Sequence, residues 1–158
     1  MSVRIRDAAP ADAEHLLHFI TELAIYEKAE HEVQATLESI HSSLFTDGAR
    51  AHAVIVEVDG TVAGFAVYFF SYSTWLAQQG LYLEDLYVSP EYRGRAAGLG
   101  LLKHLARIAV ETGCGRFEWS VLDWNEPAIA FYQKCGAAPQ DEWIRYRMSG
   151  DTLKQFAA

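Results

Sequence analysis

The stretch LYLEDLYVSPEYRGRAAGLG, from Leu81 to Gly100, constrains the fold more than any other part of the chain. An apolar run with two adjacent acids precedes a Ser-Pro break, two arginines, three glycines and then apolar residues at helical spacing. This order predicts a strand over Leu81–Val88, a glycine-rich turn and a helix from Ala97 to about Thr112. The backbone N–H groups at the start of such a helix suit a pyrophosphate. A plain strand-to-helix turn has the same pattern, so both interpretations stay open on the residues alone.

Two better-known phosphate-binding patterns do not fit this segment. It lacks the GxxxxGK[ST] of Walker loops. The dinucleotide fingerprint fails as well, because Lys103 stands where its third glycine is needed.

The rest of the chain alternates between strand and helix patterns. Asp59-Gly60 predicts a tight hairpin turn between two strands, and Tyr72–Gly80 is predicted to be a loop. The further strands are predicted at Val3–Arg6, Ala51–Val58, Thr61–Ser71, Arg116–Leu122 and Trp143–Met148, and the further helices at Pro10–Glu27, Thr36–Phe45, Pro127–Lys134 and Asp151–Phe156. We therefore expect a single mixed α/β domain over residues 1–158.

Composition and charge limit the classes of partner that we expect. The net charge of −8 argues against nucleic acid as the main partner and is compatible with a cationic small substrate. Apolar runs are too short to cross a bilayer and no apolar signal core opens the chain, so no membrane partner and a cytoplasmic location are expected. His15 and His18 share a helix face without an apparent third ligand, so no metal is expected.

Two separated stretches point to a known family. DWNEPAIAFYQKCGA (Asp123–Ala137), taken together with the glycine-rich turn, resembles the GNAT superfamily of acyl-CoA-dependent N-acetyltransferases. ELAIYEK, YLEDLYV, YRG and WNEPAIAFY, in this order, are similar to the spermidine/spermine and thialysine acetyltransferase branch. The resemblance implies a mixed, mostly antiparallel sheet that splays at its central parallel strands and is flanked by helices. It also implies acetyl-CoA as co-substrate, no metal, and a homodimer.

The resemblance also implies which residues bind acetyl-CoA. Backbone groups after the two acids would pair with the pantetheine arm, the turn would hold the pyrophosphate, and Asn125 would contact the pantetheine arm unless it serves only as a helix N-cap. The implied cofactor-binding residues are Leu86, Tyr87, Val88, Arg93, Gly94, Arg95, Ala96, Ala97, Gly98, Asn125 and Tyr132.

One departure falls inside the turn. The family pattern Arg-Gly-x-Gly-x-Gly has Ala96 in place of its second glycine when it is aligned on Tyr92. A second register, starting at Arg95, matches a shorter family pattern but shifts the helical phase, so the first is preferred. If this position requires a positive φ, Ala96 costs roughly 1–2 kcal/mol.

The residues suit acetyl transfer to an amine. A lysine-like amine is about one part in a thousand neutral at pH 7, so a base is needed. The resemblance implies Glu84 as that base, acting through water, and Asp85 as a contact for the cationic substrate. Simple strand alternation places these two acids on opposite faces. The alternative is that one of them is a buried structural partner of an arginine or a backbone group.

Tyr132 is the implied acid for the leaving CoA thiolate. Phe131-Tyr132 on a short helix would otherwise be typical of core packing, so this role depends on the family context.

The resemblance also implies three residues that bind the amine acceptor. Tyr26, Glu27 and Trp75 match substrate-side residues, and acids with aromatics suit an alkylammonium group. A solvated helix end is the alternative for Glu27. Ser73 stands where the branch has an acid, which favours a short diamine or a lysine-like amine over long polyamines. Two rival functions stay open: a protein N-terminal or lysine acetyltransferase, and a non-catalytic CoA-binding module.

Overall fold

The computed structural model describes residues 1–94 and 96–158, which form two compact units, Met1–Ser120 and Val121–Ala158. The elements of the first unit are β1 (Val3–Asp7), η1 (Pro10–Asp12), α1 (Ala13–Tyr26), η2 (Glu30–Glu32), α2 (Leu37–Leu44), β2 (Ala51–Val58), β3 (Thr61–Ser73), β4 (Gln78–Val88), η3 (Pro90–Tyr92), α3 (Ala97–Glu111) and β5 (Phe117–Trp119). Those of the second unit are α4 (Glu126–Lys134) and α5 (Gly150–Ala157).

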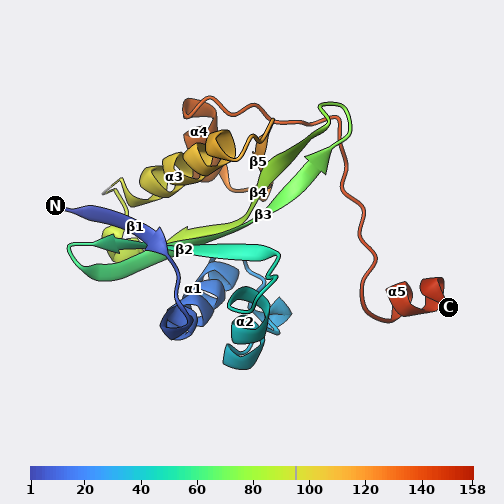
Figure 1. Ribbon diagram of the computed structural model, residues 1–158, viewed down its shortest axis with the longest axis horizontal. Coiled ribbons are helices and arrows are strands. Elements are labelled where there is room, and N and C mark those ends of the chain that lie inside the picture. Colours follow the sequence, from blue (N-terminus) through green and yellow to red (C-terminus); the bar gives the residue numbers. More distant parts are fainter. Residues whose placement is uncertain (95) are drawn as a thin grey trace. The chain divides into compact units, whose positions relative to one another are not determined.

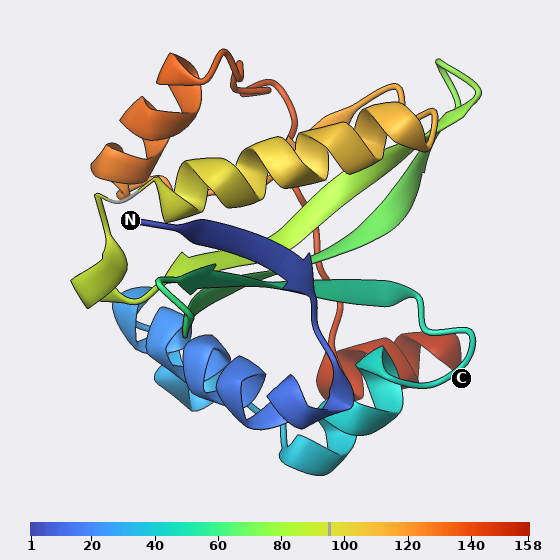
Figure 2. The ribbon, with the colours of Figure 1, turned by 60° about the vertical axis from the view of Figure 1, so that its left-hand side comes forward.

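The first unit is built on a five-stranded sheet in the order β1-β2-β3-β4-β5 (Figure 1). Successive strands from β1 to β4 are antiparallel, and β5 runs parallel to β4. The predicted mixed, mostly antiparallel sheet is therefore confirmed. The helices flank it as predicted: α1 and α2 lie on one face and α3 lies on the other (Figures 1 and 2).

Each face of the sheet packs against its helices through apolar side chains. On the α1 side, Phe19 stacks on Phe65 with ring centres 5.9 Å apart and contacts Tyr87 at 6.2 Å. On the other side, α3 buries Leu101 and Leu105 completely. α3 also packs closely on β1, because a Cβ at Gly100 would lie 3.4 Å from the Ile5 side chain. The two layers hold β4 between α1 and α3.

β4 contains an extra residue in its pairing with β3. Val67 lies opposite Asp85, and the next residue of β3, Tyr68, lies opposite Leu83. Glu84 therefore has no counterpart in the register, which defines a β-bulge. The bulge shifts the side-chain alternation by one residue between Leu83 and Asp85.

Most predicted elements are confirmed. Thr36 is the N-cap of α2, and its hydroxyl accepts a hydrogen bond from the Ser39 N–H at 3.1 Å. The Asp59-Gly60 turn joins β2 to β3 with positive φ at both residues. The predicted loop Tyr72–Gly80 is shorter than expected, because β3 continues to Ser73 and β4 begins at Gln78.

The predicted strand Trp143–Met148 is wrong. This segment is irregular, and its large side chains are exposed, Ile144 by 80% and Tyr146 by 91%. A strand needs a neighbouring backbone and an apolar partner face. The described residues of the second unit form helices and irregular chain and supply neither, so strand-forming residue types alone do not produce a strand here.

Candidate active site

The C-terminal end of α1 is fixed by a two-bond helix-ending motif. Lys28 has a left-handed backbone with φ of 61°, and its N–H donates to the Ile25 carbonyl at 3.0 Å. The N–H of Ala29 reaches back to the Ala24 carbonyl at 2.8 Å. This is the Schellman arrangement, in which a non-glycine residue pays a steric cost for the left-handed position. The motif sets the direction in which the chain leaves the helix at Glu27.

The bulge brings Glu84 and Asp85 to the same face of the sheet. Asp85 is paired with Val67, which packs against the cluster under α1 and α2. Glu84 follows Leu83, on the α3 side, so continued alternation also directs Glu84 toward the α1 face. The predicted opposite placement of the two acids is therefore wrong, because simple alternation does not allow for an inserted residue.

Two neighbouring carboxylates, Glu84 and Glu27, act on Asp85. The pKa of Asp85 is raised from 3.8 to about 6, first by burial and then by the negative charges of Glu84 and Glu27. Burial also raises the pKa of Glu27. Carboxylates that repel one another in a partly buried place favour binding of a cation, since the cation relieves both costs. Glu84, Asp85 and Glu27 therefore form an acidic cluster suited to an ammonium group.

A second polar chain ties α1 to β4. The Tyr87 hydroxyl donates to Glu22 Oε2 at 2.7 Å, and Glu22 Oε1 accepts from His18 Nε2 at 2.6 Å. Burial and the hydrogen-bonded Glu22 carboxylate together raise the pKa of Tyr87 to about 12. Tyr87 is thus a neutral, firmly held donor under the α1 helix.

Arg93 joins this network from the turn. Its Nε donates to the Val88 carbonyl at 3.0 Å. Its guanidinium carbon lies 5.4 Å from the ring centre of Tyr87 and 5.7 Å from that of Tyr26, distances typical of cation–π contacts.

The glycine-rich turn has the positive φ at Ala96 on which the predicted strain depends. Gly94 has φ of 76°, and Ala96, the N-cap of α3, has φ of 62°. Ala96 therefore occupies a position that glycine favours. Its methyl group offers no acceptor to the first turn of α3, and no side chain of the described residues caps this helix start. Arg95, also predicted to bind the cofactor, lies outside the described residues.

One edge of β4 is unpaired along the predicted pantetheine segment. β4 pairs with β5 only from Leu81 to Leu83 in the described register. Leu86, Tyr87 and Val88 therefore pair with β3 on one side and have no ladder partner in β5 on the other. An extended ligand arm suits such an edge.

Two predicted residues belong to the second unit. Asn125 is the N-cap of α4, with Oδ1 accepting from the Ala128 N–H at 3.4 Å, so the N-cap interpretation is confirmed and the pantetheine contact stays a prediction. Tyr132 lies on α4 with its ring centre 5.7 Å from that of Phe131. Its role as an acid stays a prediction.

Trp75 lies at the tip of the β3–β4 hairpin and not beside the acidic cluster. It is 79% exposed, and Arg116 lies over its ring at 5.9 Å. Six residues of β4 lie between Gln78 and Asp85, which corresponds to roughly 20 Å of strand. Ser73 accepts from the Leu76 N–H at 3.3 Å and so stabilises the hairpin turn. A substrate-side role for Trp75 stays a prediction.

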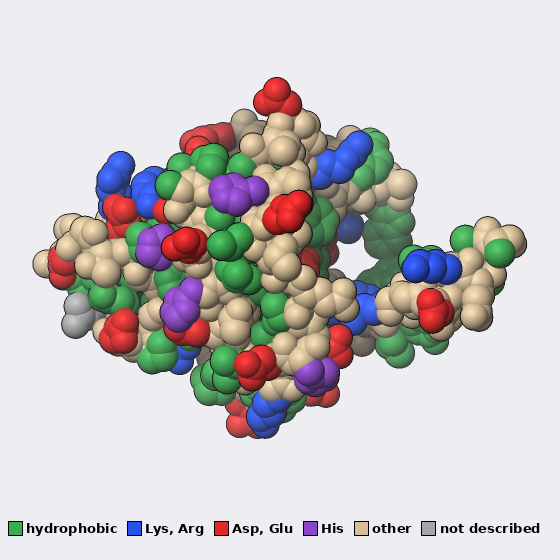
Figure 3. Space-filling view, turned by 90° about the horizontal axis from the view of Figure 1, so that it is seen from below, with side chains coloured by type: hydrophobic (Ala, Val, Ile, Leu, Met, Phe, Trp, Pro, Cys, Tyr) green, Lys and Arg blue, Asp and Glu red, His purple; other side chains and the backbone are tan. Residues whose placement is uncertain are grey.

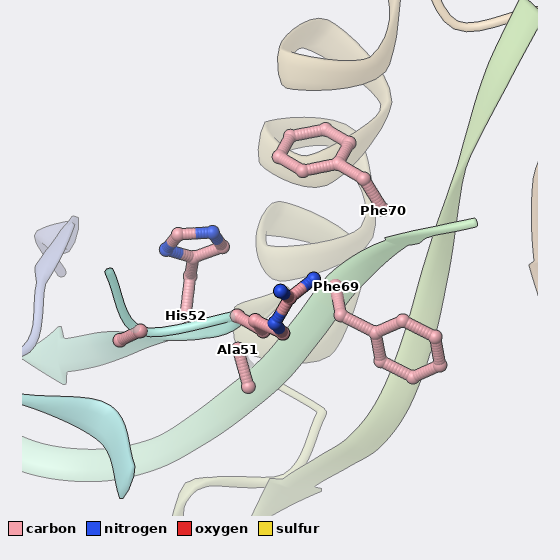
Figure 4. Close-up of a pocket in the computed structure, with 6 residues that line it drawn as sticks. Ala51, His52, Phe69 and Phe70 are labelled. Carbon is pink, nitrogen blue, oxygen red and sulfur yellow. The ribbon is translucent and has the colours of Figure 1, made fainter. Parts of the chain in front are cut away.

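A separate hollow of about 430 Å³ lies at the start of β2. Figure 4 shows His52 and Phe70 on one side of the strands and Ala51 and Phe69 on the other. Its lining includes Arg50 and no acid. An ammonium group therefore finds no charge partner in this hollow.

The histidines of α1 and α2 contact aromatic rings on or at the end of their own helices. Figure 3 shows histidine and acidic side chains interspersed over the side of α1 and α2. His18 pairs with Glu22, and among the described residues no group of three His, Cys, Asp or Glu could hold a metal ion. No helix in the described part of the chain is long and apolar enough to cross a membrane.

Sequence reasoning did not predict the contact between Glu22 and the side chain of Tyr87. Glu22 stands one helical turn before Tyr26, a spacing that puts both on one side of α1. That helical spacing could have indicated that Glu22 lies near the site. Nothing in the local sequence indicated its partner Tyr87 on β4, because the two residues are 65 positions apart.

Comparisons with known proteins agree with the fold and identify the family. The family described as "Acetyltransferase (GNAT) family" matches residues 15–137. The thialysine N-epsilon-acetyltransferase of Mus musculus is 34% identical, with 99% of this chain and 98% of that protein covered. The L-ornithine N5-acetyltransferase of Arabidopsis thaliana is 31% identical, with 98% and 87% covered.

A solved integron cassette protein from V. cholerae superimposes with a TM-score of 0.82 at 29% identity, covering 99% of this chain and 98% of that one. The chain belongs to the GNAT family and is an acetyltransferase.

Proposed function

We propose that the chain transfers the acetyl group of acetyl-CoA to a primary amine of a small cationic substrate. The observation that carries this proposal is the acidic cluster of Glu84, Asp85 and Glu27, next to the unpaired edge of β4. The cluster attracts the ammonium group, and the edge suits the pantetheine arm. The two reactants then meet at the bulge, and holding them together is itself a large part of catalysis.

The residues at the α3 end of the site fit the co-substrate. The first turn of α3 offers N–H groups and the positive end of the helix dipole to the pyrophosphate. Gly94 and Gly98 let the backbone approach closely, whereas the Cβ of Ala96 narrows that approach.

The proposed reaction is a direct attack in a ternary complex. The neutral amine nitrogen attacks the thioester carbonyl carbon, and the excess proton passes through water to Glu84. A backbone N–H of β4 stabilises the oxyanion. The C–S bond then breaks, and the thiolate takes a proton from Tyr132.

The acceptor we favour is the terminal amine of a short diamine or a lysine-like amino acid. Two curated relatives are named for thialysine and ornithine, which both carry such an amine. Ser73 in the hairpin turn also removes one of the acids that a long polyamine would use.

The test is a thiol-release assay with acetyl-CoA and an amine panel: thialysine, ornithine, lysine, putrescine, spermidine and spermine. We expect the short side-chain amines to give the highest kcat/KM. Binding of CoA without thiol release from any amine would refute the enzyme mechanism. The proposed homodimer is measured separately by sedimentation.

A further inference from the structure

Arg93 lies between two tyrosines that come from different elements. Tyr26 is the last residue of α1, and Tyr87 is in β4; the guanidinium carbon is 5.7 Å and 5.4 Å from their ring centres. The Nε of Arg93 is used by the Val88 carbonyl. We call this arrangement the arginine clamp. It connects the phosphate-binding turn directly to the end of the helix on the amine side.

The two tyrosines differ in how deeply they are buried. Tyr87 is 6% exposed and its hydroxyl is bound by Glu22, which also accepts from His18. Tyr26 is 41% exposed. The buried ring is therefore a fixed platform for the cation, and the Tyr26 ring is the part that an ordered Arg93 would restrain.

We propose that Arg93 is a positioning residue that couples binding of acetyl-CoA to binding of the amine. This inference rests on the proposed function. Binding of the pyrophosphate at Gly94 stabilises the arrangement in which the neighbouring Arg93 lies over Tyr26. The residue after Tyr26 is Glu27 of the acidic cluster. The co-substrate thereby orders the amine site without touching the amine.

The size of the effect follows from the contacts. An exposed cation–π contact changes an equilibrium by about two- to fivefold, so the clamp supports a coupling of about fivefold. Because coupling between two ligands is reciprocal, the amine must tighten CoA by the same factor. This reciprocity allows the coupling to be measured with CoA, which lacks an acetyl group to transfer.

The rival role for Arg93 is direct binding of the pyrophosphate. The two roles predict different results for Arg93→Gln. If Arg93 acts through the clamp, Arg93→Gln abolishes the coupling, and its affinity for CoA in the absence of the amine stays within about twofold of wild type. Loss of a phosphate ligand weakens CoA alone and leaves the coupling intact, since a charged contact to phosphate acts whether or not the amine is present.

The experiment is calorimetric titration of CoA into the full chain, with and without saturating thialysine. Wild type is first shown to bind CoA and to release thiol from acetyl-CoA; failure there refutes the proposed function itself. We expect thialysine to tighten CoA about fivefold in wild type and by less than about twofold in Arg93→Gln. A wild-type ratio of one, or an unchanged ratio in Arg93→Gln, overturns the proposal.

Tyr26 supplies a matched pair if Arg93→Gln does not fold. Tyr26→Phe keeps the ring face, and we expect it to retain the coupling. Tyr26→Leu removes the ring, and we expect it to lose the coupling while CoA alone binds as in wild type. Equal coupling in the two variants overturns the clamp.

Discussion

Asp85 of β4 lies opposite Val67 of β3, although Glu84, the residue before it, has no counterpart on that strand. The extra residue is accommodated as a bulge, so Glu84 and Asp85 both reach the face covered by α1. Here the charges of Glu84 and Glu27 act on Asp85. The position of one inserted residue thus determines whether the chain has an acidic cluster.

Asp85→Asn tests the burial of this carboxyl. A pKa raised in the folded state to about 6 means that the folded protein binds the proton more tightly than the unfolded chain. Stability from this group is present below about pH 4 and is lost as the pH rises to about 6. We expect the free energy of unfolding of Asp85→Asn to be about 2 kcal/mol higher than that of wild type at pH 8, and this difference should shrink toward pH 4.

Denaturant unfolding at several pH values measures this difference. Glu118→Gln, on the exposed side of β5, is the control and should change stability by less than about 0.5 kcal/mol. A difference between Asp85→Asn and wild type that does not vary with pH would show that the charge is not penalised by burial.

Glu84→Gln tests the proton acceptor. Without a base, the rate depends on the small fraction of neutral amine, which grows with pH. We expect the loss in kcat/KM to be largest at low pH, about tenfold to a hundredfold near pH 7, and to shrink toward the amine pKa. Glu91→Gln, exposed in η3, is the matched control. A ratio to wild type that is flat across pH assigns Glu84 a purely structural role.

Ala96→Gly tests the strain in the phosphate-binding turn. The left-handed backbone of Ala96 costs roughly 1–2 kcal/mol, which glycine avoids apart from its larger entropy in the unfolded chain. We expect a net gain of about 0.5–1 kcal/mol in unfolding free energy and tighter binding of CoA. Ala97→Gly, one residue further and inside α3, should instead destabilise by about 1 kcal/mol. Destabilisation by both substitutions contradicts the account.

Tyr132→Phe tests the acid for the leaving thiolate. We expect kcat to fall by about a hundredfold or more while acetyl-CoA binds as in wild type, because only the hydroxyl is removed. Tyr72→Phe, exposed in the hairpin, is the comparison. Rapid-quench rates and a binding titration separate the two effects; an unchanged kcat excludes Tyr132 as the acid.

Local patterns predicted most of the fold. Asp59-Gly60 was predicted to be a hairpin turn, acts through nearby backbone atoms and is confirmed. The ends of the helices are just as local, since Thr36 caps α2 through the Ser39 N–H. The separate motifs along the chain were also sufficient to predict the family.

The features that were missed depend on distant residues. The bulge at Glu84 is defined by pairing with β3, and the Glu22–Tyr87 hydrogen bond joins elements 65 residues apart. The segment Trp143–Met148 has strand-forming residue types but no described partner within its unit. In each case the deciding contact lies far away in the sequence, where periodicity carries no information.

We propose that the acidic cluster holds a side-chain ammonium group beside the acetyl-CoA thioester. The product formed from acetyl-CoA and thialysine, identified by mass spectrometry with fragmentation, tests this proposal. We expect acetylation of the side-chain amine by wild type, with the rate sharply reduced in a Glu27→Gln/Asp85→Asn double variant that still binds CoA. Acetylation at the α-amine, or full activity in the double variant, would contradict it.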